Sequence, residues 1–131
     1  MNKLLGTYAA TALVMLALDM LWLGVIAKPL YQQGIGHLMA QPPRIAVAVL
    51  FYALYPVGLL IFAVLPHATQ APWHQAVMYG ALFGFFAYAT YDLTNLATLK
   101  GWPVGLSLLD VGWGTLASAL AVAAGRAIYV R

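Results

Sequence analysis

Three acidic side chains are the best candidates for chemistry in this sequence, and each falls inside a stretch that is otherwise apolar. Asp19, Asp92 and Asp110 are the whole acidic content of the chain, whose Asp and Glu together number 3. A charged side chain at the centre of a membrane helix costs about 2.5–3.5 kcal/mol, so it usually faces the interior of a helix bundle or a wet cavity. A carboxyl group in such a place can serve as a general acid or base. We therefore take Asp92 as the principal acid/base candidate, with Asp19 and Asp110 as its partners.

Other polar and aromatic side chains are spaced so that they can join these carboxyl groups. Tyr88, Asp92 and Asn95 follow the i, i+4, i+7 spacing of one helix face. Trp22 and Trp113 each follow an aspartate by three residues, which places ring and carboxyl group on the same side of a helix. The substrate-binding candidates are Asn95, Tyr88, Tyr91, Tyr52, Trp22, Trp113, Lys100 and Arg44.

Basic residues are few and lie outside the apolar stretches. Lys100 and Arg44 flank these stretches, where their side chains can reach inward and attract the phosphate or carboxylate of a lipid at headgroup level. The net charge of +3 comes from 6 basic and 3 acidic residues without a basic run. We therefore expect a membrane lipid as partner and no nucleic acid.

The rest of the sequence predicts the helices that would position these side chains. Hydrophobic residues make up 64% of the chain and charged residues 7%, whereas a soluble domain is about half apolar and a quarter charged. A hydrocarbon core of about 30 Å takes about 20 helical residues to cross. We predict an all-α fold, a single transmembrane domain over residues 1–131 that forms an integral membrane bundle of four transmembrane helices. The spans are roughly 4–27, 45–65, 75–99 and 104–124.

The connections and the chain ends complete the predicted topology. Residues 28–44 mix apolar and polar side chains, which favours a short interfacial helix between the first and second spans, with a flexible loop as the alternative. The first stretch is longer than the core of a signal peptide and contains Asp19, so we expect it to be retained. Four spans place both termini on the same side of the membrane. The free N-terminal amine and the short flanking segments favour the inside.

This topology predicts that the carboxyl groups share one depth. Asp19 lies eight residues before the end of its span, Asp92 lies seven before the end of its own, and Asp110 lies six after the start of the last span. The first and third spans end, and the fourth begins, on the same side of the membrane. A rise of 1.5 Å per residue then places all three carboxyl groups about 9–12 Å inside one boundary. The polar candidates should line a pocket in one leaflet.

We predict neither a metal ion nor a cofactor. Three carboxyl groups can chelate Mg²⁺ or Ca²⁺, but their spacing does not specify such a site. His37, His67 and His74 show no i, i+3 or i+4 pair, which argues against a di-iron oxygenase and against a zinc protease. The chain has no Cys, so thiolate metal sites and disulfides are excluded.

The longest polar stretch also carries a family resemblance. The string YDLTNLATLKGWP (residues 91–103), with Asp110-x-x-Trp113-Gly114 and the earlier Asp19-x-x-Trp22-Leu-Gly24, resembles the bacterial DUF2177 family of predicted membrane proteins. The resemblance extends over nearly the whole chain. It implies a small four-helix protein of the bacterial inner (cytoplasmic) membrane. It also implies genes that neighbour those of cyclopropane-fatty-acyl-synthase-like and amine-oxidase-like proteins, which favours a role in lipid modification.

These observations leave three hypotheses about function. The leading one is participation in membrane lipid or fatty-acyl modification, as an enzyme or as the lipid-presenting accessory of one. The second is a proton-linked transporter or the pore subunit of an oligomer. The third is a purely structural accessory subunit, in which each Asp is a hydrogen-bond hub that holds helices together. A membrane-enzyme partner and a homo-oligomer are both compatible with these hypotheses.

Overall fold

The computed structural model describes residues 2–69 and 71–131, and in this part of the chain all regular secondary structure is helical. The α-helices are α1 (Asn2–Leu21), α2 (Lys28–Ile35), α3 (Ile45–Leu59), α4 (Trp73–Thr98) and α5 (Val104–Tyr129). π-helical turns extend α1 over Trp22–Ile26 and α3 over Leu60–Val64, and 3₁₀ turns follow at Gly36–Leu38 and Leu65–His67. The predicted all-α class is confirmed.

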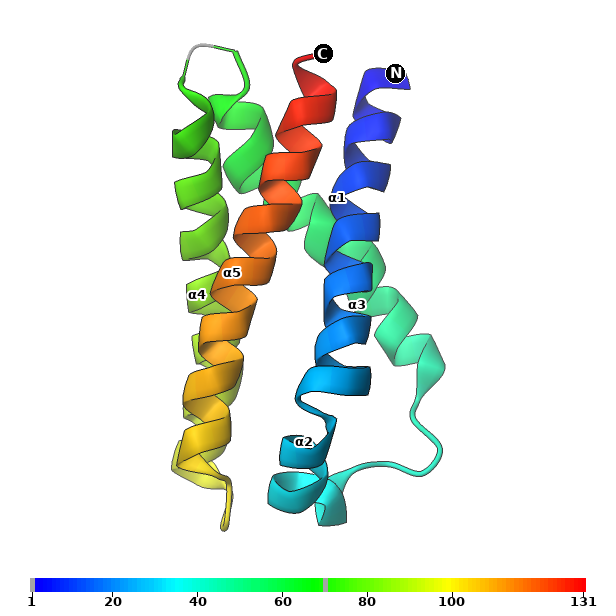
Figure 1. Cartoon of the computed structure of the whole chain (residues 1–131), viewed down its shortest axis with the longest axis vertical. Helices are drawn as coiled ribbons and strands as arrows, with labels where there is room; N and C mark the ends of the chain where they lie inside the picture. The colour runs from blue at the N-terminus through cyan, green and yellow to red at the C-terminus, as the bar shows by residue number, and fades with distance from the viewer. Residues whose placement is uncertain (1, 70) are drawn as a thin grey trace.

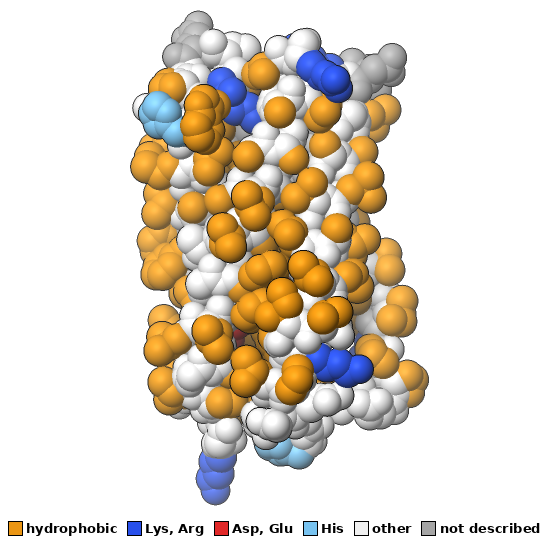
Figure 2. Space-filling view, in the orientation of Figure 1, with side chains coloured by type: hydrophobic (Ala, Val, Ile, Leu, Met, Phe, Trp, Pro, Cys, Tyr) orange, Lys and Arg blue, Asp and Glu red, His pale blue; other side chains and the backbone are white. Residues whose placement is uncertain are grey.

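The four long helices form a bundle, and the short helix α2 lies at one end of it (Figure 1). α4 and α5 are antiparallel neighbours, α1 packs against α5, and α3 lies inclined behind α1. Both ends of the chain lie at the end of the bundle opposite to α2. The basic side chains visible in Figure 2 lie toward the two ends of the bundle, and the surface between them is mostly hydrophobic.

Three helical segments among the described residues are long and apolar enough to cross a membrane, namely Lys3–Ile26, Ile45–His67 and Val104–Tyr129. They coincide with three of the four predicted spans. The fourth predicted span corresponds to α4, which has the length for a crossing at 26 residues. Its apolar character falls below that of the other three, because residues 90–95 place two Thr, a Tyr, an Asp and an Asn in one segment.

Proline residues mark several of the joints between helices. Pro72 and Pro103 are the N-cap residues of α4 and α5. Pro29 occupies the first turn of α2, where a missing backbone N–H costs nothing. Pro56 differs, since it lies inside α3 and there removes a hydrogen bond of the helix. α3 then continues as the π-helical turn Leu60–Val64.

The N-terminal half of α3 stands apart from the bundle. Residues 45–51 are all exposed, and the buried residues of this helix begin only at Tyr55. Figure 1 shows this half of α3 diverging from the other long helices. Because α3 diverges from the bundle over residues 45–51, space is left near the α2 end of the molecule.

α4 and α5, by contrast, approach so closely that a methyl group would not fit between them. A Cβ atom added at Gly84 would collide with the backbone oxygen of Gly114 and with the side chain of Ser118, and one at Gly80 would lie 2.6 Å from the Val122 side chain. Small residues permit this approach of helix backbones in membranes. The tight pair forms the fixed wall against which the other helices are arranged.

Candidate functional site

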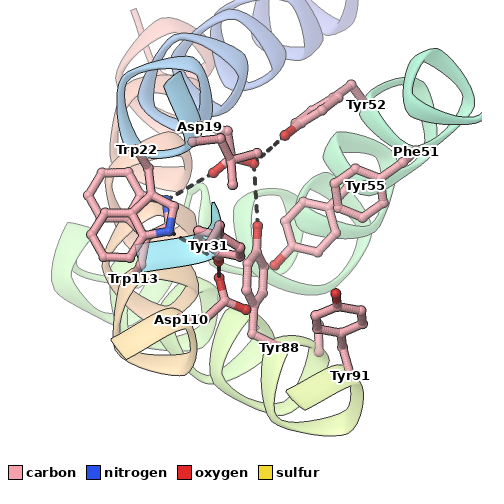
Figure 3. A pocket seen from close by; sticks show the side chains of 12 residues that line it. Asp19, Trp22, Tyr31, Phe51, Tyr52, Tyr55, Tyr88, Tyr91, Asp110 and Trp113 are labelled. Carbon is pink, nitrogen blue, oxygen red and sulfur yellow. Dashed lines mark hydrogen bonds between the residues drawn. The ribbon is translucent and has the colours of Figure 1, made fainter. Parts of the chain in front are cut away.

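A cavity of about 390 Å³ lies between the helices on the side of α2. Every α-helix of the described chain contributes to its wall, either directly or through the turn that extends it. The lining residues are Asp19, Trp22, Leu23, Tyr31, Phe51, Tyr52, Tyr55, Ala87, Tyr88, Tyr91, Asp110 and Trp113. Figure 3 shows the labelled side chains around this pocket, most of them aromatic.

Asp19 joins α1 to three other helices through its carboxylate. The Tyr52 hydroxyl of α3 donates to Asp19 Oδ2 at 2.6 Å, and the Tyr88 hydroxyl of α4 approaches the same atom at 3.5 Å. Trp113 Nε1 of α5 donates to Oδ1 at 2.9 Å. With 4% of its surface exposed, Asp19 is buried. The oxygens of its carboxyl group are therefore satisfied by donors from three neighbours.

Asp110 holds the short helix α2 against α5. The Tyr31 hydroxyl donates to Asp110 Oδ1 at 2.5 Å, and Trp22 Nε1 donates to the Tyr31 oxygen at 3.4 Å. Burial, followed by the hydrogen bond to Asp110, raises the pKa of Tyr31 above its ordinary value, so its hydroxyl keeps the proton that it donates. Trp22, Tyr31 and Asp110 thus form one connected chain of hydrogen bonds at the pocket wall.

Asp92 lies behind the pocket rather than on its wall. It is 1% exposed and is not among the lining residues. Its neighbouring acidic group is Asp110. Asp92 Oδ2 has no hydrogen-bond partner among the described residues. Asp110 and Asp92 thus form a pair of acidic residues, in which Asp110 lines the cavity and Asp92 is buried behind it.

The aromatic wall is built from packed pairs of rings. Trp22 stacks on Trp113 with ring centroids 4.7 Å apart and planes 6° from parallel. Tyr55 meets the Tyr88 ring edge-on at 6.1 Å, and Tyr91 meets Trp102 edge-on at 5.8 Å. Offset and edge-to-face pairs of this kind fix ring orientation. The rings are thereby held in place around the two carboxyl groups.

The remaining predicted site residues lie apart from the cavity. Asn95 is half-buried on α4, Lys100 is exposed just after the end of that helix, and Arg44 is exposed at the N-cap of α3. None of these three lines the cavity. Lys100 and Arg44 are at the α2 end of the molecule, outside the helical spans, because both flank helix ends that lie there.

Tyr31 and Tyr55 line the cavity without having been predicted as site residues. Tyr55 carries a detectable signal, because it follows Tyr52 by three residues and so shares a helix face with it. Its hydroxyl is 2.7 Å from Ser118 Oγ, where either group can donate. Tyr31 could not be found in the same way. It lies between two predicted spans, so its position along the membrane normal cannot be counted from the end of a helix.

The lining residues define what the site can do chemically. They supply carboxyl and phenol oxygens, which accept, donate and exchange protons, and they include no Lys, Arg or His. Across the described residues, no three Asp or His side chains come together in a way that would hold a metal ion. Ser118 is hydrogen-bonded to Tyr55. The site therefore offers proton transfer and binding rather than a Ser–His nucleophile.

Comparisons with other proteins place the chain at the level of a family. Neither the curated proteins nor the solved structures gave a match. A model of one family, described as predicted membrane protein, matches residues 4–127, which include all three aspartates and every residue of the cavity wall. The apolar helices agree with that description. The chain belongs to the DUF2177 family of membrane proteins.

Proposed function

We propose that this protein takes part in the modification of membrane lipids or fatty acyl chains, as an enzyme or as the accessory that presents the lipid to one. The cavity is the observation that supports this proposal. It places two carboxyl groups and a set of phenols beside lipid-facing apolar surface. A lipid is a substrate that such a protein meets within the bilayer, and the pocket supplies polar groups that can contact its reactive portion.

In the proposed topology α4 is a fourth transmembrane helix and α2 lies in the interface. Two observations support a crossing by α4. It has 26 residues, and it packs closely against α5, which is long and apolar enough to cross a membrane. Its buried Asp92 faces protein instead of lipid. α2 is short and pairs exposed polar residues with the buried Ile35. The protein would then be a multi-pass protein of the bacterial inner membrane with both termini cytoplasmic.

The proposed roles follow from which atoms face the cavity. Asp110 is the candidate acid/base group, because it lines the cavity and has the carboxyl group of Asp92 as a neighbour with which it can exchange a proton. Asp19 orients substrate together with Tyr52 and Tyr88. Lys100 and Arg44 attract a lipid phosphate toward this end of the bundle.

Comparative lipidomics tests this proposal. A deletion strain should differ from its parent in acyl-chain or headgroup composition, and the wild-type gene should restore the parental pattern. Asp110→Asn keeps the size of the side chain and its hydrogen-bond acceptor but removes a titrating group from the cavity. It should accumulate in the membrane yet fail to restore the lipid pattern. The control variant is Thr115→Ser, on the same helix and outside the cavity wall, which should restore the parental lipid pattern fully.

A purely structural role is the second candidate, and the bonds of Asp19 favour it specifically. One carboxylate that receives hydrogen bonds from α3, α4 and α5 is what a scaffold hub requires. If the deletion strain keeps its lipid composition while Asp19→Asn prevents accumulation of the protein, the structural role is supported and lipid modification is excluded.

A proton-linked transporter has less support from the opposite half of the bundle. Thr7 and Thr11 are fully buried there, and each hydroxyl donates to the backbone oxygen four residues earlier. These groups are satisfied within α1 itself. They supply no polar path that continues from the cavity to the other end.

A further inference from the structure

The cavity wall combines negative charge with aromatic rings. Eight of its 12 lining residues are Trp, Tyr or Phe, two are aspartates, and none is Lys, Arg or His. The faces of aromatic rings attract cations, Trp most strongly. Carboxylates attract cations as well, and they repel phosphates and other carboxylates. The wall therefore selects for a positively charged group.

We propose that this cavity binds the ammonium group of a zwitterionic membrane lipid, such as a phospholipid with an ethanolamine or choline headgroup. The inference rests on the proposed function and names its substrate class. The cavity volume of about 390 Å³ lies in the range of about 300–1,000 Å³ that is usual for small-molecule sites. An ammonium group in it would lie between Asp19 and Asp110 and against the surrounding rings.

The rings and carboxylates are held in place before any ligand arrives. Trp113 is fixed on one side by its hydrogen bond to Asp19 and on the other by the stacked Trp22 ring. Asp110 is fixed by the Tyr31 hydroxyl. Because these groups need no rearrangement, binding a cation between them loses little side-chain entropy.

A second cavity favours a lipid over a free amine as the source of the ammonium group. It measures about 370 Å³ and lies between α1 and α3, lined by Leu16, Met20, Ala48, Val49, Tyr52 and Ala53. Tyr52 belongs to both cavities, with its hydroxyl directed at Asp19. The other lining residues of this second cavity are apolar, so it fits an acyl chain whose headgroup occupies the first.

Headgroup titrations on the purified full-length protein in detergent test the proposal. Trp22 and Trp113 line the cavity, so intrinsic fluorescence reports its occupation. Phosphatidylethanolamine or phosphatidylcholine should bind at least about tenfold more tightly than phosphatidylglycerol with the same acyl chains. Equal or tighter binding of phosphatidylglycerol would overturn the proposal. Free ethanolamine and tetramethylammonium should bind more weakly than the lipids, and if they bind equally well the lipid is not the source.

Variants locate the binding in the cavity. Tyr91 is half-exposed at its wall, so its substitution has little consequence for folding. Tyr91→Leu removes a ring and should weaken binding of the zwitterionic lipid by about 2- to 30-fold, whereas Tyr91→Phe keeps the ring and should bind like the parent. Asp110→Asn should weaken it by more than about tenfold. If both Tyr91→Leu and Asp110→Asn bind like the parent, the ammonium group is not in this cavity.

The outcome is separable from that of the proposed function. A deletion strain with altered lipids, together with a protein that shows no headgroup preference, would leave lipid modification standing and reject the ammonium site. An unaltered lipid composition with strong headgroup preference would reject modification and retain the site.

Discussion

Tyr31 is the side chain that connects the interfacial segment to the buried carboxyl groups. Its hydroxyl donates to Asp110 and accepts from Trp22, while Ile35, one turn later on α2, packs against Trp102 and Leu106. The position of α2 therefore depends on one charge-assisted hydrogen bond and a small apolar contact. Hydrogen bonds to charged groups contribute about 1.5–3 kcal/mol each.

Tyr31→Phe should loosen α2 without unfolding the bundle. Loss of about 1.5 kcal/mol raises the undocked fraction of α2 by about tenfold. The chain has no Cys, so Ile35→Cys, at a buried position, gives a single reporter thiol. Its rate of maleimide labelling should rise by about tenfold when Tyr31→Phe is added, while the midpoint of thermal unfolding changes little. An unchanged labelling rate would show that the hydroxyl does not hold α2.

The pH dependence of this docking follows from the raised pKa of Tyr31. A pKa that is higher in the docked state means that the contribution is fully present below the ordinary tyrosine value of about 10. It is lost only as the pH rises through the higher docked value. The ratio of labelling rates with and without Tyr31→Phe should therefore stay constant from about pH 7 to about pH 9.

At the scale of elements, the packing of α4 on α5 depends on the absence of side chains. Gly84→Ala would place a methyl group against the Gly114 backbone oxygen and Ser118. Since backbone cannot yield as a flexible side chain does, we expect a loss of about 1–3 kcal/mol in the free energy of unfolding. Gly112→Ala is the matched control, because a Cβ there meets nothing within 4 Å and alanine favours helix by about 1 kcal/mol. Unfolding in mixed micelles measures the free energy of unfolding of both variants. Equal values for Gly84→Ala and Gly112→Ala would contradict the close packing of α4 on α5.

The elements also show how far a sequence can be interpreted. Apolar length locates the helices, so that a span over residues 75–99 is predicted where α4 covers Trp73–Thr98. Counting residues from the helix ends gives the depth of a side chain, because the rise per residue is fixed. Rotation about the helix axis is set by packing between helices and cannot be counted in this way. Asp92 therefore faces Asp110 instead of the cavity.

Side chains outside the spans were the least predictable part of the site. The reach of Lys100 and Arg44 was inferred from their long stems, but both side chains are exposed and away from the cavity wall. Tyr31 reaches Asp110 because α2 folds back beneath the bundle, a contact between residues 79 positions apart. Such contacts arise from tertiary packing, which local sequence patterns do not encode.

At the scale of the whole molecule, the topology makes a direct prediction about the two membrane faces. If α4 crosses the membrane, His74 near its start and Lys100 just after its end lie on opposite sides. Lys100→Cys should then react with an impermeant maleimide in intact spheroplasts, and His74→Cys should react only after lysis. Both positions are exposed, so accessibility does not limit either reaction. Labelling of both from the same side would mean that α4 does not cross.

The diverging half of α3 makes the surrounding bilayer part of the site. Residues 45–51 are exposed on the outside of the bundle, while Phe51, Tyr52 and Tyr55 of the same helix form one wall of the cavity. The opposite wall is the α4–α5 pair, which cannot close further because its backbones already touch. We therefore expect the width of the cavity to depend on how strongly neighbouring acyl chains press on α3. Stiff, ordered chains should press α3 inward and fluid chains should release it, so that the site would respond to the physical state of the membrane.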